Sequence, residues 1–394
     1  MSTTTTAPEA QPAPARQYWM DQLRGTAILL VIINHLRLVQ QFWDGAAPWA
    51  MVELSEALSP FRMPALLFAS GMLLARSLRR PPRRYLAGKA RALLWPWLLW
   101  SAVMLPLLGW GHAVEPLWWL NGMYTWFLAA LFVYYVIGLL TRRVPPGWIA
   151  LASVAVWTAM PLLGIAHDMA GPRPDKFLYY AVFFFAGAAL RPLLERGPVP
   201  WPVTAGALGL ATAWALYAAM IDHDPSVPVL AQAVVLLAVL GAVGVAQRLP
   251  RLRVLRPVEW LGRNSVVPYL VHLPVIEVLV RGLDLPPSPA VFALYYLATL
   301  GLCVVAVLLR PATGFLYAFP TRRRGPAGER GEQAARAGAP ERTGLTGRAG
   351  PTGRAGPAEP AGRTERPGAA GRARPTEHAE PVAGREAAAA RARR

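Results

Sequence analysis

An arginine and a histidine stand eleven positions apart within one long apolar stretch, residues 18–40. Eleven helical residues make three turns plus about 20°, so Arg24 and His35 are expected on one helix face, about 16 Å apart along the axis. If this helix spans a membrane, His35 lies near the hydrocarbon centre, where ionisable groups are costly and mark functional sites. A neutral histidine there suits a general base for a hydroxyl or a transient acyl carrier. Arg24 would bind an anion or stabilise developing oxyanion charge.

The same residues also have purely structural interpretations. His35 fits a buried histidine whose hydrogen bonds are satisfied, and Arg24 fits an arginine whose side chain reaches the membrane surface. Asp21 lies three positions before Arg24, where its carboxylate can pair with the guanidinium. Asp21 fits equally well as the residue that caps the N-terminus of the helix.

Another cation lies deep in the next apolar stretch, residues 50–75. Arg62 stands between Pro60 and Pro64, at a depth comparable to that of His35. An arginine at that depth needs a partner or a water-filled cavity, and the alternative is a structural ion pair with a carboxylate. The two prolines, together with Gly71, predict a broken or kinked helix that lines protein or a cavity.

Two arginines follow one turn after this second span. Arg76 and Arg79 are three positions apart, so on a helix they point the same way and can clamp phosphates from one side of the membrane. The alternative is that they only contribute to the positive charge that orients membrane proteins.

A further group of reactive side chains lies at the start of a later apolar stretch, residues 264–281, which we expect to be the ninth membrane span. Ser265, Tyr269 and His272 follow one another at i, i+4 and i+7, which places them on one helix face. His272 is the second histidine expected within the membrane. It fits a catalytic role or a role in helix packing.

The elements that position these residues are predicted to be membrane helices. The 394-residue chain is 54% hydrophobic and only 16% charged, a smaller charged share than soluble proteins carry. Several windows reach the length of about 18 apolar residues that crosses a bilayer. We therefore expect an all-α polytopic membrane protein of about ten transmembrane helices. The expected spans are 22–42, 50–75, 92–110, 125–141, 147–165, 177–190, 200–220, 227–246, 264–281 and 289–310.

Charge and composition predict the topology and the domain limits. The loops after every second span are basic, so the positive-inside rule puts both termini in the cytoplasm. Residues 1–17 are expected to be a disordered lead, residues 18–320 the membrane domain, and residues 321–394 a disordered cytoplasmic tail rich in Ala, Gly, Pro and Arg. Basic loops and the sixteen Arg of the tail explain the net charge of +18, so no nucleic-acid partner is expected. No spacing of Cys and His predicts a metal site.

Six segments, in chain order, resemble the integral-membrane acyltransferase-3 family. Its hallmark is an Arg and a His separated by ten residues in the first membrane helix, as Arg24 and His35 are here. The Met-Pro pair preceded by Arg62 is most similar to the sugar O-acetylase branch. The similar segments are Met20 to Gly25 with Asn34-His35, Phe61 to Leu74, Arg76 with Arg79, Lys89 to Pro96, Thr125 to Phe132 with Trp126, and Asn264-Ser265 to Pro274.

The resemblance implies an enzyme that moves an acyl group, in that branch acetyl, from cytoplasmic acyl-CoA to a hydroxyl of a glycan, a lipid-linked sugar or a secondary metabolite. It implies no bound cofactor. His35 would act as base or acyl carrier, Arg24 as its electrostatic partner, and Arg76 and Arg79 as ligands of the donor phosphates. Asp21, Arg62, Trp126, Ser265, Tyr269 and His272 would support the site or lie on the acceptor side.

One feature of the sequence departs from the pattern of this family. Ala65 and Ala69 stand where the family commonly has bulkier residues, which would alter the acyl pocket.

Nearly all of the basic residues are Arg, which suggests a high-GC bacterial genome and therefore the bacterial cytoplasmic membrane. A non-catalytic transporter or flippase of a glycolipid or polysaccharide precursor is the alternative function, because intramembrane Arg and His residues suit it as well.

Overall fold

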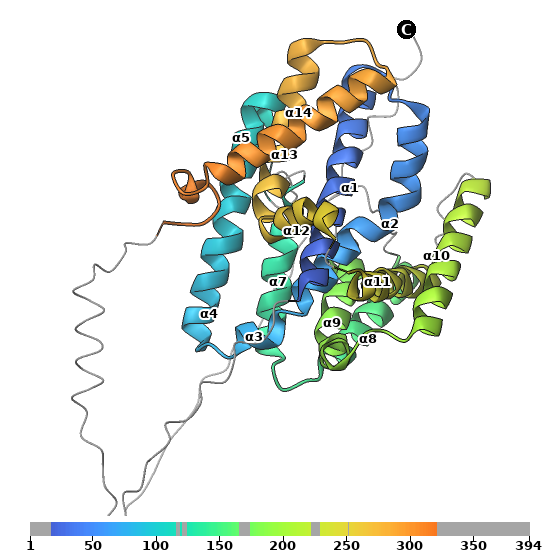
Figure 1. Ribbon diagram of the computed structural model, residues 1–394. Helices are drawn as coiled ribbons and strands as arrows, with labels where there is room; N and C mark the ends of the chain where they lie inside the picture. Colours follow the sequence, from blue (N-terminus) through green and yellow to red (C-terminus); the bar gives the residue numbers. More distant parts are fainter. Residues whose placement is uncertain are drawn as a thin grey trace, which may run out of the picture. The chain divides into compact units, whose positions relative to one another are not determined.

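The computed structural model describes residues 17–115, 119, 124–164, 174–221, 229–250 and 252–320, and every regular element in these ranges is a helix (Figure 1). Apart from Gln17, the expected lead 1–17 and the expected tail 321–394 lie outside the described residues. The all-helical class predicted from composition is therefore confirmed for the membrane domain.

Eight helices in the described part of the chain are long and apolar enough to cross a membrane. Each coincides with one expected span. Their bounds are α1 Tyr18–Trp43, Trp49–Leu78 (α2 Trp49–Gly71 and α3 Leu74–Leu78), Pro82–Leu108 (α4 Pro82–Lys89, the π-helical turn Ala90–Leu94 and α5 Trp95–Leu108), Pro146–Leu163 (beginning with α8 Pro146–Ala159), Lys176–Arg196 (within α9 Pro174–Arg196), α11 Leu230–Arg248, α13 Val266–Leu283 and α14 Pro289–Leu308.

The other two expected spans also coincide with helices. The shorter apolar helix α7, Trp126–Leu140, occupies the place of the fourth span. Helix α10, Trp201–Ile221, occupies the place of the seventh and contains no charged residue. One short helix was not expected: α12, Arg256–Arg263, lies in a basic loop and begins with Pro257 in its first turn.

The prolines of the second span do not interrupt it. Helix α2 runs through Pro60 and Pro64, and the break falls at the turn after Gly71, before α3 begins. Gly71 is needed there because α2 and α9 approach closely: a Cβ on Gly71 would overlap the carbonyl oxygen of Phe184. In return, a Cβ on Gly187 would overlap the carbonyl oxygen of Phe68.

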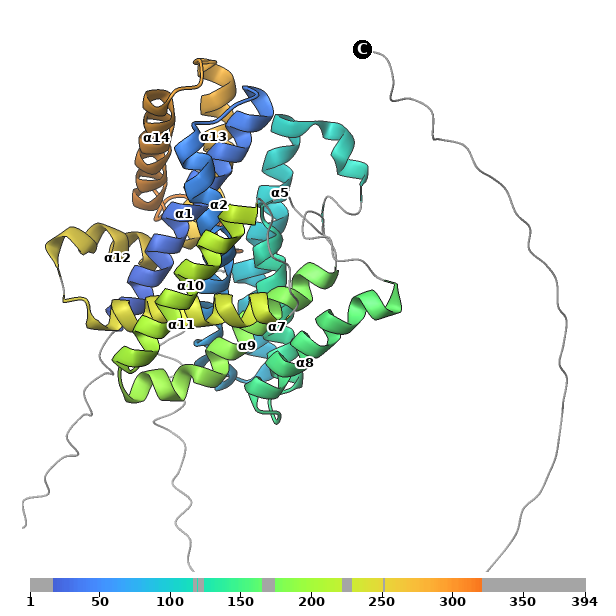
Figure 2. The same cartoon turned by 90° about the vertical axis from the view of Figure 1, so that its right-hand side faces the viewer.

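Helix α1 is the element around which the membrane domain packs. It contacts α2, α11, α12, α13 and α14, and both views show it beside α2 (Figures 1 and 2). Buried residues recur along its length, including Leu23, Ile28, Ile32 and Leu36. Because α1 is one unbroken helix from Tyr18 to Trp43, the expected geometry of Arg24 and His35 holds.

Candidate active site

The two membrane histidines lie against one another. Nε2 of His272 on α13 is 3.2 Å from Nδ1 of His35 on α1, with ring centroids 4.9 Å apart and ring planes at 62°. Both α1 and α13 place their histidine at the contact between the two helices. The sequence indicates two histidines within the membrane, and the structure brings them together across 237 positions.

The hydrogen bonds of the pair assign the roles of its nitrogens. Nδ1 of His272 is 3.0 Å from the carbonyl oxygen of Pro268, and a carbonyl only accepts, so this nitrogen carries the proton. In the neutral ring Nε2 is then an acceptor, and it faces Nδ1 of His35. Nδ1 of His35 also lies 3.0 Å from the carbonyl oxygen of Val31. His35 therefore carries its proton on Nδ1 and keeps the lone pair of Nε2 available as a base.

The imidazole rings of His35 and His272 differ in how far they are exposed. His272 is completely buried (0% exposed), whereas His35 is only partly buried. Of the two rings, His35 is therefore the one with exposed surface, and His272 lies behind it. This arrangement has the form of a base oriented by a third group, as in hydrolytic triads.

Tyrosines hold His272 in position. The rings of Tyr124 and His272 meet edge to face with centroids 5.6 Å apart, and the hydroxyl of Tyr124 donates to the carbonyl oxygen of Leu270 at 2.6 Å. Tyr269 donates to the carbonyl oxygen of Tyr124, and its ring lies 6.1 Å from that of His272. Tyr269 is thus brought to the pair, as predicted by its helix face. Tyr124 was not predicted, although it directly precedes the Thr-Trp-Phe segment.

Trp126 belongs to an adjoining layer. Its ring is 5.0 Å from that of Tyr180, and Nζ of Lys176 lies 4.5 Å from its centroid. Both partners come from α9. Lys176 and Arg62 are close enough to His35 to interact with it electrostatically. Trp126 therefore fixes a cation near the histidines without touching them through a described contact.

Arg62 is buried in a network of polar side chains near the same depth. Its guanidinium donates to the hydroxyls of Ser55, at 3.1 Å, and Ser59, at 2.9 Å. Ser55 in turn donates to Asn34, which also accepts from Arg37 at 3.4 Å. The alternative for Arg62 was a structural ion pair with a carboxylate, but Glu56, a carboxylate on the same helix, lies 2.8 Å from Arg37.

Arg24 lies away from the histidines, eleven positions before His35 and nearer the start of α1. Its Nη2 donates to the carbonyl oxygen of Ala69 at 2.9 Å. Asp21 is buried in the first turn of α1 and interacts electrostatically with Arg24. Since the helix begins at Tyr18, Asp21 is not its N-cap, and that alternative is wrong.

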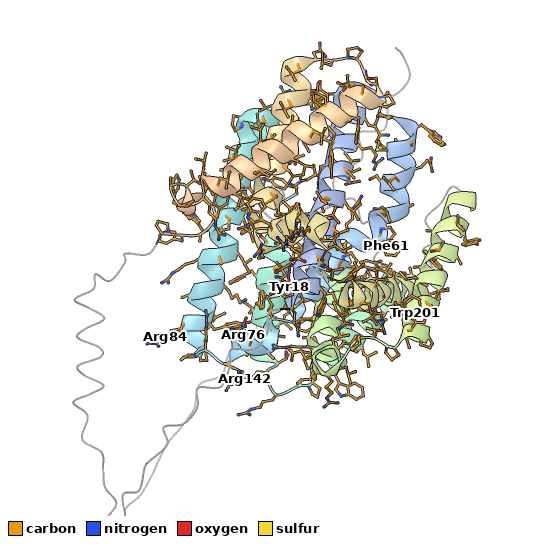
Figure 3. The ribbon with its side chains drawn as sticks, in the orientation of Figure 1. Tyr18, Phe61, Arg76, Arg84, Arg142 and Trp201 are labelled. Atoms are coloured by element: carbon orange, nitrogen blue, oxygen red, sulfur yellow. The ribbon has the colours of Figure 1, made fainter. Side chains whose placement is uncertain are left out.

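Arg76 and Arg79 are exposed at the end of the second span, on α3 and just after it. Figure 3 shows Arg76, Arg84 and Arg142 toward the same end of the bundle. Lys89 lies nearby: its Nζ is 3.3 Å from the hydroxyl of Ser77 and 3.2 Å from the centre of the Tyr135 ring. This end of the domain is therefore rich in cations, as a binding site for phosphates would need.

Ser265 is not brought to the histidine pair. It is the residue before α13, about 10 Å along the helix axis from His272, and no described contact joins the two. Among the described residues, no group of three or more His, Cys, Asp and Glu side chains could hold a metal ion.

Comparison with known proteins gives one match. A family model described as an acyltransferase domain, that of the acyltransferase-3 family, matches residues 17–308. The matched region contains every candidate site residue, from Asp21 to His272. This match supports an acyltransferase over the transporter or flippase. No curated protein and no solved structure matches the chain.

Proposed function

Because the chain belongs to the acyltransferase-3 family, and is therefore an acyltransferase, we propose that it is an O-acyltransferase of the bacterial cytoplasmic membrane. In this proposal the donor is a cytoplasmic acyl-CoA, with acetyl as the transferred group. The acceptor is a hydroxyl of a glycan, a lipid-linked sugar or a secondary metabolite. The Met-Pro pair after Arg62, typical of sugar O-acetylases, favours a sugar hydroxyl.

The observation that carries the proposal is the contact between His35 and His272. Nε2 of His35 removes the proton from the acceptor hydroxyl, and the oxygen forms a bond to the thioester carbonyl carbon. The tetrahedral intermediate then expels the CoA thiolate, which takes the proton back from Nε2. Nε2 of His272 accepts a hydrogen bond from the Nδ1–H of His35 throughout, so His272 keeps His35 in the reactive tautomer and stabilises its imidazolium.

The donor is proposed to enter from the cation-rich end of the bundle. Arg76 and Arg79 would bind its phosphates, and the thioester would reach along α1 past Arg24 to His35. Arg24 is hydrogen-bonded to the carbonyl oxygen of Ala69, so it is held between the two ends of this path. Its positive charge would favour an anionic donor there.

Acyl transfer in proteoliposomes tests the proposal. The purified full-length protein is supplied with acetyl-CoA labelled in the acetyl group and with a panel of hydroxylated glycans. We expect label on the acceptor and free CoA in equal amounts, and neither product with His35→Gln. Free CoA without labelled acceptor for every glycan and metabolite tried, or equal labelling by His35→Gln, would contradict the proposal.

A further inference from the structure

A cavity of about 630 Å³ lies between α1 and α2 on one side and α10 and α11 on the other. Its volume is in the range of about 300–1,000 Å³ that small-molecule sites occupy. Phe61, Leu58 and Leu30 line it from α2 and α1, and alanines such as Ala215 and Ala242 line it from α10 and α11. Figure 3 shows Phe61 between α2 and the α10–α11 pair.

The mouth of the cavity is apolar. Leu54 on α2 and Leu216 on α10 line it, and their side chains are 40% and 62% exposed. Both helices are apolar and coincide with expected membrane spans. Glu53 is exposed at the same mouth. In a membrane the exposed leucines of this opening meet lipid chains, so a hydrocarbon chain can enter sideways between them, beside Glu53.

One cationic group lines the cavity at depth. Arg62 is nine residues from Glu53 on α2, about 14 Å along the helix axis, and is only 8% exposed. A buried arginine needs negative charge to offset its desolvation. Its guanidinium donates hydrogen bonds to Ser55 and Ser59, which are neutral.

The network around Arg62 carries excess positive charge. Ser55 and Asn34 connect Arg62 to Arg37, and the carboxylate that pairs with Arg37, Glu56, has a side chain 58% exposed to solvent. Arg37 is buried, and its Nε has no hydrogen-bond partner among the described residues. Two buried guanidinium groups with one solvated carboxylate are suited to a phosphate, which accepts several charge-assisted bonds.

We propose that this cavity binds the acceptor as a polyprenyl-phosphate-linked sugar: a long isoprenoid chain lies between α2 and α10, and a phosphate next to the hydroxylated headgroup lies at Arg62. This deepens the proposed function, on which it rests, because it assigns the acceptor to lipid-linked sugars. Arg62 is joined through the hydroxyl of Ser55 to Asn34, the residue that precedes His35 on α1, so a headgroup attached to a phosphate at Arg62 lies near the base.

Binding to the purified full-length protein in detergent micelles tests the proposal. The probe is a tritiated long-chain polyprenyl phosphate, competed by the unlabelled compound, by the polyprenol of equal length, by inorganic phosphate and by phosphatidylglycerol. We expect the polyprenol to bind roughly tenfold or more weakly, which corresponds to about 1.4 kcal/mol, and inorganic phosphate not to compete. Arg62→Gln should bind the phosphate and the alcohol equally. Equal affinity of the two in the native protein, or equal competition by phosphatidylglycerol, would overturn the proposal.

Variants that fill the cavity provide the second arm. Ala215→Trp on α10 and Ala57→Trp on α2 project into it from opposite walls and should each weaken polyprenyl phosphate binding roughly tenfold. Ala213→Trp is the matched control, because Ala213 is exposed on α10 and does not line the cavity. If both cavity variants bind as tightly as the control, the chain lies elsewhere. Acetyl-CoA binding, measured on the same variants, should stay native.

The two proposals fail separately. Lipid binding with no acyl transfer to any hydroxyl would leave the cavity site and remove the proposed reaction. Acyl transfer to soluble glycans, unaffected by Ala215→Trp and Ala57→Trp, would keep the reaction and remove the lipid site.

Discussion

The histidine pair and the pair of arginines after the second span are built in different ways. Around His35 the neighbours are fixed: a second imidazole at 3.2 Å, itself completely buried and held by Tyr124 and Tyr269. Arg76 on the short helix α3 and Arg79 directly after it are both exposed. A group that transfers protons must stay within a few tenths of an ångström of its partner. Cations that bind phosphates do not need such a fixed position until the ligand arrives.

The comparison also separates rate from affinity. Interactions that act only in the transition state change kcat, whereas interactions that hold the donor equally before and during the reaction change KM. Substitutions in the histidine pair and in the arginine pair should therefore have effects of different kinds as well as of different sizes.

The largest effect is expected at His35. His35→Gln keeps a polar side chain of similar length but cannot take a proton at neutral pH, so kcat should fall about 10²–10⁴-fold. His35→Ala should do the same. Acetyl transfer by protein purified in detergent and normalised to the folded fraction measures this loss. Transfer at a rate near that of the native protein would move the base elsewhere.

An intermediate effect is expected for the double substitution Arg76→Ala and Arg79→Ala. Loss of charge-assisted phosphate bonds should raise KM for acetyl-CoA roughly tenfold, with kcat little changed. The matched control is Arg142→Ala with Arg143→Ala, a second exposed pair of arginines. Equal KM values for the two double variants would mean that Arg76 and Arg79 serve only to orient the protein in the membrane.

The smallest effect on activity is expected for Gln22→Leu. The amide of Gln22 donates to Glu259 at 3.0 Å in the buried contact between α1 and α12, so its loss leaves a buried carboxylate without that partner. The free energy of unfolding should fall by about 1–3 kcal/mol, measured by denaturant titration in detergent. Turnover per folded molecule should not change. A loss of kcat comparable to that of His35→Gln would show that the site extends to this contact.

The sequence predicted the helices well, because the thickness of a bilayer sets the length of an apolar span. All ten expected spans coincide with helices of the described chain. The geometry of Arg24 and His35 was also predictable, since both belong to one unbroken helix whose period is known. Helix α12 was missed because its eight residues lie in a basic loop and are too few for a membrane span, the only kind of helix that the apolar stretches indicate.

The partner of His35 was not predictable. Periodicity says which face of a helix is apolar or polar, but not which helix packs on that face or at what height. His35 and His272 are 237 positions apart, and only the packing of α1 on α13 joins them. Ser265, predicted on the same helix face as His272, lies about 10 Å from it along the axis of α13, a separation that seven helical positions already imply. Lys176 could have been noticed as one of two lysines in the chain, yet its contact with Trp126 depends on how α9 packs on α7.

The central claim is that His272 acts through His35, and a double-mutant cycle on kcat tests it most directly. His272→Gln should lower kcat roughly tenfold or more, with KM for acetyl-CoA unchanged, because it removes the group that fixes the tautomer of His35. Added to His35→Gln, it should cause no further loss, since residues that act as a unit are not additive. Losses that multiply in the double variant, or a His272→Gln enzyme as fast as the native one, would contradict the paired-histidine site.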